Sequence, residues 1–377
     1  ARGAPVSTTH AIVGGVLGAG IAAGGWGIAD WGAVGQIAAS WVISPVLGGA
    51  IAAGFLYVIK RTITYKSDLL AAAERTVPLL IALMAWSFTT YLMLKGLKQL
   101  WRVNFATAGI VGLVVAGIVW FVMRGYVRRS KSRIENSKDG VNDLFTIPLI
   151  FAAALLSFAH GANDVANAVG PLAAINDAVT SGGIATKAGI PLWVMLVGAI
   201  GIALGLALFG PKLIRTVGSE ITELDRARAF CVALSAAITV IIASQLGLPV
   251  SSTHIAVGGV FGVGFLREYL KVSYARMIDE IRTHHQDEDA TAVDAFLERF
   301  NAASVPERSQ MLAEMKRQSG AGTLYKKERK GLRNIHRIEL VKRTLLFRIA
   351  AAWLITVPAT AIVAAMVYYM LRGAMLP

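Results

Sequence analysis

The chain has 377 residues, of which 55% are hydrophobic and only 16% are charged, and its formal net charge is +14. Soluble domains have about a quarter charged residues, so this composition excludes an ordinary soluble globular protein. The basic residues lie in clusters between long apolar stretches, which is typical of membrane-protein loops and argues against nucleic acid as a partner. Cys231 is the single cysteine, which excludes a disulfide framework and a cysteine-based metal site.

Apolar stretches recur along the chain, and about 20 apolar residues are enough to cross a bilayer as a helix. They predict an all-α polytopic membrane protein embedded in the lipid bilayer. In chain order the candidate spans are 31–59, 77–94, 103–123, 146–175, 189–210, 229–266 and 347–371. A hydrophilic insertion at 267–343 separates the last two, and its patterned segments predict short amphipathic helices.

One stretch near the beginning of the chain returns much later. PVSTTHAIVGGVLGAG (5–20) and PVSSTHIAVGGVFGVG (249–264) are identical at 11 of 16 positions, with a constant offset of 244. A second pair, AASWVISP (38–45) and AAAWLITVP (350–358), aligns Trp41 with Trp353. The chain therefore contains two copies of a longer unit.

The charges between these paired motifs predict opposite orientations for the two copies. The first copy has a short connection without Lys or Arg (21–40), whereas the second copy has the basic insertion. Since basic loops stay on the cytoplasmic side, the same position in the two copies faces opposite sides of the membrane. This is an inverted-topology repeat, which in secondary transporters places the substrate near the bilayer midplane.

The proline and the hydroxyl residues of each copy predict the tip of a re-entrant helical hairpin. GLPVSSTH interrupts an apolar run, proline suits the first turn of a helix, and Ser and Thr cap helix N-termini. Hydroxyls and free backbone N–H groups at such a tip bind anions, although they could instead serve only the broken helix ends; the duplication favours binding. The predicted donors to a tetrahedral oxyanion are Ser7, Thr8, Thr9, Ser251, Ser252 and Thr253.

Two other features of each copy have structural interpretations. The pairs Gly14/Gly18 and Gly258/Gly262 have the spacing that lets helices approach closely. His10 and His254, one in each copy, are interpreted as fixing the hairpin tips rather than titrating.

The apolar segment FAHGANDVANAVGP (158–171) contains an acid, Asp164. A carboxylate within a membrane span is costly unless it is paired, protonated or solvated, so it is a candidate functional residue. With the amide oxygens of Asn163 and Asn167 it could hold a small cation, or it could carry a proton. Gly161 and Gly170 are expected to loosen this helix, and the alternative to a functional acid is a structural Asp that caps a helix break. For His160, packing or hydrogen bonding is favoured over a proton relay.

GANDVANA (161–168), together with PVSSTH and PVSTTH, resembles the signature of the inorganic phosphate transporter (PiT) family. The resemblance covers nearly all of the chain except the insertion. It implies a transporter rather than an enzyme, which takes up inorganic phosphate, free or as a metal–phosphate complex, with a co-transported H⁺ or Na⁺ and no bound cofactor or metal. By this resemblance Asn163 and Asn167 serve phosphate or the cation, Asp164 serves the cation or the coupling, and the hairpin hydroxyls serve phosphate.

The family signature occurs in both halves of its members, which raises an expectation about the beginning of this chain. Asn163 precedes Pro249 by 86 positions, so a partner motif would precede Pro5 by as much and fall before residue 1. The sequence therefore predicts a chain truncated at its N-terminus. Transport of another oxyanion such as sulfate stays open, as does an intramembrane hydrolase using Ser251 or Ser252 with His254 and Asp164.

These observations predict five segments and an integral protein of the bacterial inner membrane, with the insertion in the cytoplasm and a homo-oligomer left open. The segments are the remainder of the first repeat (1–75), linking helices with a basic cytoplasmic loop (76–143), a second repeat with both motifs (144–266), the insertion (267–343) and the last helix of the second repeat (344–377).

Overall fold

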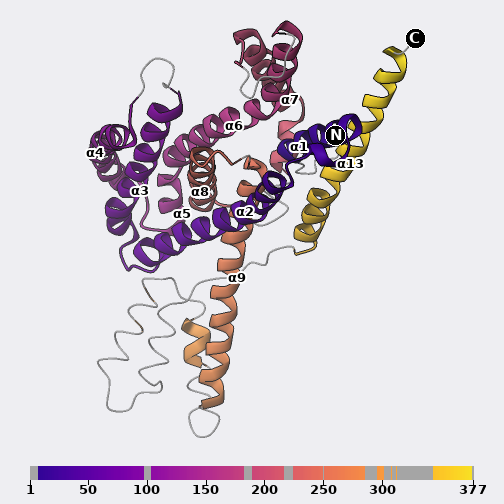
Figure 1. Cartoon of the computed structure of the whole chain (residues 1–377). Coiled ribbons are helices and arrows are strands. Elements are labelled where there is room, and N and C mark those ends of the chain that lie inside the picture. Colours follow the sequence, from indigo (N-terminus) through magenta and orange to yellow (C-terminus); the bar gives the residue numbers. More distant parts are fainter. Residues whose placement is uncertain are drawn as a thin grey trace.

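The computed structural model describes residues 7–96, 103–181, 189–215, 224–248, 250–284, 295–300, 307, 311 and 343–375. Within these ranges the fold is a bundle of helices, shown in Figure 1. The α-helices are α1 (Thr8–Gly24), α2 (Trp31–Ile59), α3 (Leu69–Tyr91), α4 (Phe105–Ser130), α5 (Lys138–Leu144), α6 (Thr146–Ser181), α7 (Leu192–Arg215), α8 (Arg226–Gln245), α9 (Ser252–His284) and α13 (Arg343–Met375).

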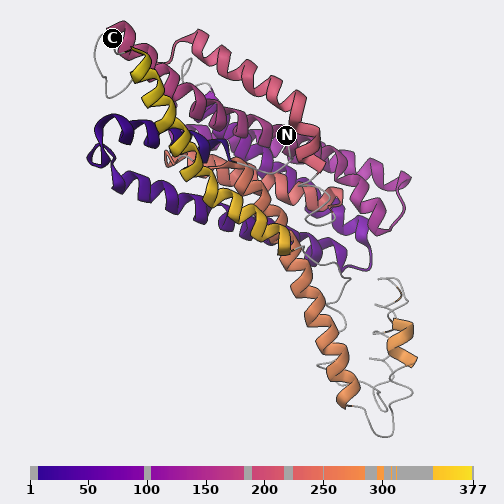
Figure 2. The same cartoon turned by 90° about the vertical axis from the view of Figure 1, so that its right-hand side faces the viewer.

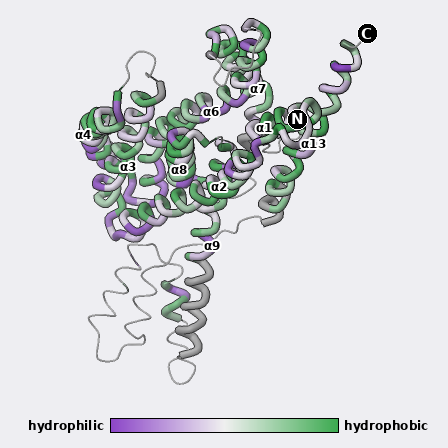
Figure 3. The backbone as a smooth tube through the Cα atoms, in the orientation of Figure 1, coloured by the Kyte–Doolittle hydropathy of each residue, from purple (hydrophilic) through white to green (hydrophobic). Residues whose placement is uncertain are grey.

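Seven of the described helical segments are long and apolar enough to cross a membrane, and α1 is a shorter apolar helix. The prediction of an all-α polytopic membrane protein is therefore confirmed. Figure 3 shows hydrophobic residues along the outer helices α4, α7 and α13. In α8 61% of the apolar window is buried, against 6% in α7 and in α13, so α8 is central and the other two lie at the outside of the bundle.

Short polar side chains fix where several helices begin. Asp30, Asp68 and Asp225 precede α2, α3 and α8, and each carboxylate accepts a hydrogen bond from a backbone N–H of the first turn, at 2.8–3.0 Å. Asn104 does the same for α4, with a bond of 2.8 Å from the Thr107 N–H. Each such cap supplies a partner for one of the otherwise unpaired N–H groups at a helix start.

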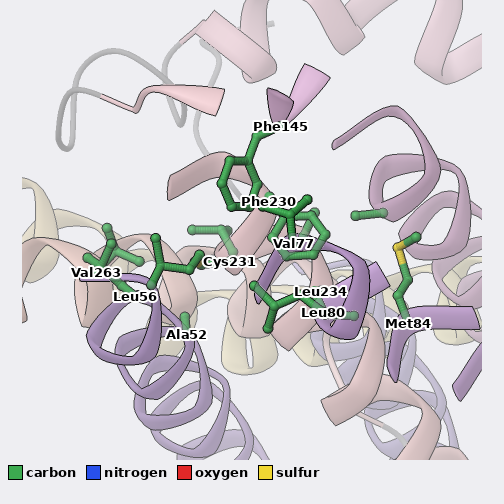
Figure 4. Packing of buried hydrophobic residues seen from close by; sticks show 14 of the residues in the cluster. Ala52, Leu56, Val77, Leu80, Met84, Phe145, Phe230, Cys231, Leu234 and Val263 are labelled. Atoms are coloured by element: carbon green, nitrogen blue, oxygen red, sulfur yellow. The ribbon is translucent and has the colours of Figure 1, made fainter. Parts of the chain in front are cut away.

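The apolar core surrounds α8 and is drawn in Figure 4. Phe145 packs on Phe230 with ring centroids 5.5 Å apart, and both side chains are fully buried. Cys231 and Leu234 of α8 are fully buried as well, which agrees with the interpretation of Cys231 as a small apolar residue. This core holds α2, α3, α6 and α9 around α8 and so fixes the positions of the hairpin tips at its far end.

The helices of the two copies pack in exchanged pairs: α1 lies along α13, and α9 lies along α2 (Figures 1 and 2). A Cβ on Gly14 or Gly18 would meet the backbone of Val357 or Ala361, whereas a Cβ on Gly258 or Gly262 would meet that of Pro45 or Gly49. Pro45 and Val357, like Gly49 and Ala361, are separated by the same 312 positions as Trp41 and Trp353. Equivalent glycines therefore meet equivalent backbone, which confirms the close-packing role of both pairs.

Several sequence-derived boundaries need correction. The expected span 229–266 is divided between α8 and α9 by residues 246–251, as the hairpin prediction required. By contrast, α6 runs without interruption through Gly161 and Gly170, so the expected loosening is wrong; flanking helical residues hold both glycines in the continuous hydrogen-bond ladder. Helix α3 spans the division expected at 75/76, because Asp68 starts it earlier, and α9 continues past 266 to His284.

Beyond residue 270 the α9 helix projects away from the bundle, as Figures 1 and 2 both show. Most of the insertion, including 285–294 and 312–342, lies outside the described residues, so its expected amphipathic helices are largely untested. Residues 295–300 are helical and bury Leu297 and Phe300.

Candidate transport site

Asp164 is the point where both hairpin copies meet. Its carboxylate, only 7% exposed, accepts hydrogen bonds from the hydroxyl of Thr8 in α1 (3.0 Å) and from that of Ser252 in α9 (3.1 Å). The Asn163 amide donates to the same carboxylate at 3.0 Å. Residues separated by 244 positions in the chain thus bind one acid on a third helix, as a shared site requires.

A second set of hydrogen bonds ties the tips to each other. The Thr9 hydroxyl, 1% exposed, donates to the carbonyl oxygen of Val250 at 3.1 Å and accepts from the Asn167 amide at 2.8 Å. The Asn163 amide also donates to the Val250 carbonyl, at 3.0 Å. Val250 directly precedes the second hydroxyl run, so the expected proximity of the two tips is confirmed.

Ser7 and Ser251 cap the two helix starts. The Ser7 hydroxyl oxygen accepts a bond from the His10 N–H at 3.2 Å, and the Ser251 oxygen accepts one from the His254 N–H at 3.3 Å. Both serines are buried, at 0% and 2% exposure. They are helix caps in equivalent positions, and their oxygens are already engaged at the starts of α1 and α9.

Thr8 and Thr253 differ from the buried hydroxyls. Thr8 is exposed and Thr253 is half-buried. Among the described residues Thr253 has no side-chain hydrogen bond, whereas its equivalent Thr9 has the two described above. The structure thus brings Thr8, Thr9, Ser252, Asn163, Asp164 and Asn167 into one hydrogen-bonded cluster, with Thr253 beside it on the first turn of α9.

His160 completes the surroundings of the acid. It lies one turn before Asp164 on α6, and its Nε2 is 2.9 Å from the carboxylate. The side chain is 42% exposed, so it connects the buried acid to the outside of the cluster. The N-termini of α1 and α9 supply positive potential here, and the acid's described partners include no Lys or Arg.

A ring cluster lies behind the tips, and sequence reasoning found its members but not their contact. The His10 ring packs on Trp41 at a tilt of 36° with centroids 3.7 Å apart, and His254 stacks on Trp353 at 3.6 Å. The two histidine rings meet edge to face at 4.4 Å. This contact could have been inferred from the duplication of both motifs, because equivalent His–Trp pairs from two copies can meet only around a common centre.

The hydrolase alternative does not have the required geometry. The His254 ring packs on Trp353 and His10, and neither ring nitrogen has a hydrogen-bond partner among the described residues. The Ser252 hydroxyl donates to Asp164 rather than to a histidine. A serine nucleophile of a triad needs a histidine base within hydrogen-bond reach, and among the described residues neither serine is hydrogen-bonded to the His254 ring.

A membrane-spanning helix bundle in which two helix N-termini and their hydroxyls face one buried acid is the arrangement expected of a membrane transporter. The comparison with known families makes this specific: the model of the phosphate transporter family matches residues 1–364. The chain belongs to this family, so the predicted resemblance and the absence of an enzymatic role are confirmed.

Individual relatives agree with this assignment. A Helicobacter pylori protein named "Putative phosphate permease" is 51% identical over 376 residues, which are 97% of this chain and 70% of that protein. A Pyrococcus abyssi protein of the same description is 37% identical over 268 residues, which are 70% of this chain and 65% of that protein. A solved structure described as the sodium-dependent phosphate transporter matches with a TM-score of 0.75 at 30% identity, over 99% of this chain and 75% of its own.

Proposed function

We propose that the protein imports inorganic phosphate together with a cation, by alternating access, through the cluster around Asp164. The observation that carries this proposal is the convergence of Thr8 and Ser252, one from each copy, on a single buried carboxylate. Membership of the phosphate transporter family supports phosphate as the substrate.

The anion would bind at the facing N-termini of α1 and α9. Hydroxyls at two opposed helix starts can donate to several oxygens of a tetrahedral anion, and the first-turn N–H groups and helix dipoles add favourable potential. Thr8 is exposed and Thr253 half-buried, so both are within reach of an incoming ion. The caps Ser7 and Ser251 hold these turns in shape.

A cation explains how phosphate can approach a carboxylate. Two unit negative charges 4 Å apart repel by about 4 kcal/mol at an effective dielectric constant of 20. A cation held by Asp164 with the amide oxygens of Asn163 and Asn167 removes most of this repulsion, so each ion favours binding of the other. This mutual dependence is the coupling of a symporter.

Sodium is the first candidate for the coupling ion. Sodium prefers hard oxygen ligands, which Asp164, Asn163 and Asn167 supply. The matching solved structure is described as sodium-dependent. A proton is the second candidate, because His160 lies 2.9 Å from Asp164 and could share a proton with it.

Alternating access would use the exchanged pairing of the two copies. Each tip helix packs on the tryptophan helix of the other copy through equivalent glycines, which is the arrangement an inverted repeat would give. Rocking of one copy against the other would open the cluster to each side in turn. The basic clusters support a cytoplasmic location for the end of the bundle that carries them, in a bacterial inner membrane.

Uptake of labelled phosphate into vesicles containing the protein tests this function. Sodium and pH gradients are imposed separately, a chelator is added to remove metal–phosphate complexes, and excess sulfate is the competitor. We expect uptake that needs an inward sodium gradient and resists both chelator and sulfate. Uptake that is indifferent to both gradients would contradict symport, and inhibition by sulfate would assign a broader oxyanion substrate.

A further inference from the structure

The histidine–tryptophan contacts behind the two tips are equivalent in sequence but differ in hydrogen bonding. The Nδ1 of His10 lies 3.4 Å from the carbonyl oxygen of Trp353. A carbonyl oxygen only accepts, so the proton of this bond is on Nδ1. The equivalent bond in the other copy would join His254 to the carbonyl oxygen of Trp41. His254 does not make this bond, because neither of its ring nitrogens has a hydrogen-bond partner among the described residues.

A second equivalent pair on the tryptophan helices differs in the same sense. The Thr356 hydroxyl of α13 donates to the carbonyl oxygen of Ala352 at 2.6 Å. Its equivalent on α2, 312 positions earlier, is Ser44, which is 5% exposed and whose hydroxyl has no partner in the part of the chain that the structure describes. Both Ser and Thr can bond back to the preceding turn of a helix, so the difference is one of conformation.

The unpaired nitrogens of His254 raise the free energy of the state that the structure shows. The side chain is 0% exposed, and its nitrogens have no surface that water could touch. A buried polar atom without a partner loses its hydration and gains no hydrogen bond in return. The ring contacts with Trp353 and His10 are weaker than a hydrogen bond and compensate only in part. A state in which His254 has a partner would therefore be stabilised by this ring.

We propose that His10 and His254 exchange this bond during transport: His254 donates to the Trp41 carbonyl in the other state of the cycle, in which His10 has released Trp353. This inference rests on the alternating access proposed above, in which the two copies exchange roles. The two histidine rings meet with centroids 4.4 Å apart, at the junction of the copies, so the ring of one copy responds to movement of the other.

The exchange reaches the transport cluster through the first turns of α1 and α9. His10 follows Thr8 by two residues, and His254 follows Ser252 by two, so each ring is attached to the turn whose hydroxyl donates to Asp164. The two histidines are therefore positioning residues for the tips. Movement of α9 along α2 is easy where glycines of the two helices meet, because no side chains interlock there.

The distance between the two copies reports which state is populated. Spin labels are attached to Ile43→Cys in α2 and Leu246→Cys after α8, because these side chains are 62% and 69% exposed and lie outside the transport cluster. Cys231 is fully buried and does not react with the label. Pulsed electron paramagnetic resonance then gives the populations of the distances in the purified protein without phosphate.

Phenylalanine at either histidine position keeps the ring and removes its nitrogens. His10→Phe removes a bond of the state that the structure shows and should raise the population of the other state about threefold. His254→Phe removes the bond of the other state and should lower its population about threefold. The two equivalent substitutions should thus shift the populations in opposite directions, whereas a role in packing alone would shift them in the same direction or not at all.

Two variants are the controls. Thr90→Val removes a buried hydroxyl of α3 that is likewise unpaired among the described residues, and it should leave the populations unchanged. His10→Asn keeps an N–H donor near the position of Nδ1 and should restore the unaltered populations. Shifts in the same direction, or no shift in either Phe variant, would overturn the proposal, as would an equal shift in Thr90→Val.

Nitrogen-15 spectra of the protein with labelled histidines test the exchange if a Phe variant does not fold. His254 should show a hydrogen-bonded Nδ1–H signal whose fraction matches the fraction lost from His10, and a single unbonded His254 signal would overturn the proposal. Neither measurement needs transport. Absent phosphate uptake therefore contradicts the proposed function, whereas normal uptake with unchanged populations contradicts only the exchange.

Discussion

The two copies of the hairpin motif have the same local structure but different partners. In each, a buried serine caps the helix, a histidine packs on a tryptophan, and glycines pack against an exchanged helix. The next hydroxyls differ: Thr9 is buried between Val250 and Asn167, whereas its equivalent Thr253 is half-buried without a hydrogen bond among the described residues. Local sequence therefore sets the turn, but its surroundings decide which hydroxyls stay accessible to a ligand.

Replacement of Asp164, the acid that both copies share, should have the largest effect on phosphate uptake. Asp164→Asn should reduce gradient-driven phosphate uptake at least a hundredfold, because loss of one partner from a buried charged network costs about 3–5 kcal/mol. Uptake into vesicles measures this, and Asp177→Asn on the same helix is the control, since Asp177 contacts neither tip through its side chain. Near-normal coupled uptake by Asp164→Asn would remove the acid from the mechanism.

The second largest effect is expected when either of the two hydroxyls that donate to Asp164 is removed. Thr8→Ala and Ser252→Ala should each weaken phosphate affinity by about 10–100-fold, since a hydrogen bond to a charged group is worth about 1.5–3 kcal/mol. The double variant should fall short of the summed effects, because both hydroxyls meet one carboxylate. Strict additivity in a double-mutant cycle would show that the tips act independently.

The exchanged helix packing predicts a paired effect on stability. Gly18→Ala and Gly262→Ala each place a methyl group against opposing backbone, and such overpacking costs about 1–3 kcal/mol. Gly15→Ala, where the methyl group would meet no neighbour within 4 Å, should be neutral or stabilising. Thermal unfolding followed by size-exclusion chromatography measures all three. A destabilised Gly15→Ala with an unaffected Gly18→Ala would reverse the assigned contact faces.

The smallest effect is expected where the copies differ. Thr9→Ala breaks hydrogen bonds to Val250 and Asn167 and should cost about 1 kcal/mol of tip stability. Thr253→Ala should leave stability unchanged and lower only phosphate affinity. Parallel unfolding and binding titrations separate these outcomes. Equal changes of stability and of phosphate affinity in the two variants would mean that the two copies are functionally equivalent.

Much of the fold was predictable because its signals are local. Long apolar runs predicted the spans, and the break near Val250 divides α8 from α9 as expected. Asp164 was identifiable by the cost of an acid within an apolar stretch. The prediction that Gly161 and Gly170 loosen α6 was wrong, because a glycine is only weakly unfavourable inside a packed helix.

The sequence by itself determined the class of protein, the paired hairpin motifs and the candidate ion-binding residues, since each follows from composition or from neighbours along the chain. Only the tertiary structure decided that Ser7 and Ser251 cap while Thr8 and Ser252 reach Asp164, and that His10 bonds to the Trp353 carbonyl whereas its equivalent His254 makes no such bond among the described residues. The physical reason is range: capping acts within one turn, whereas contacts between residues far apart in the chain depend on which helix faces fit together.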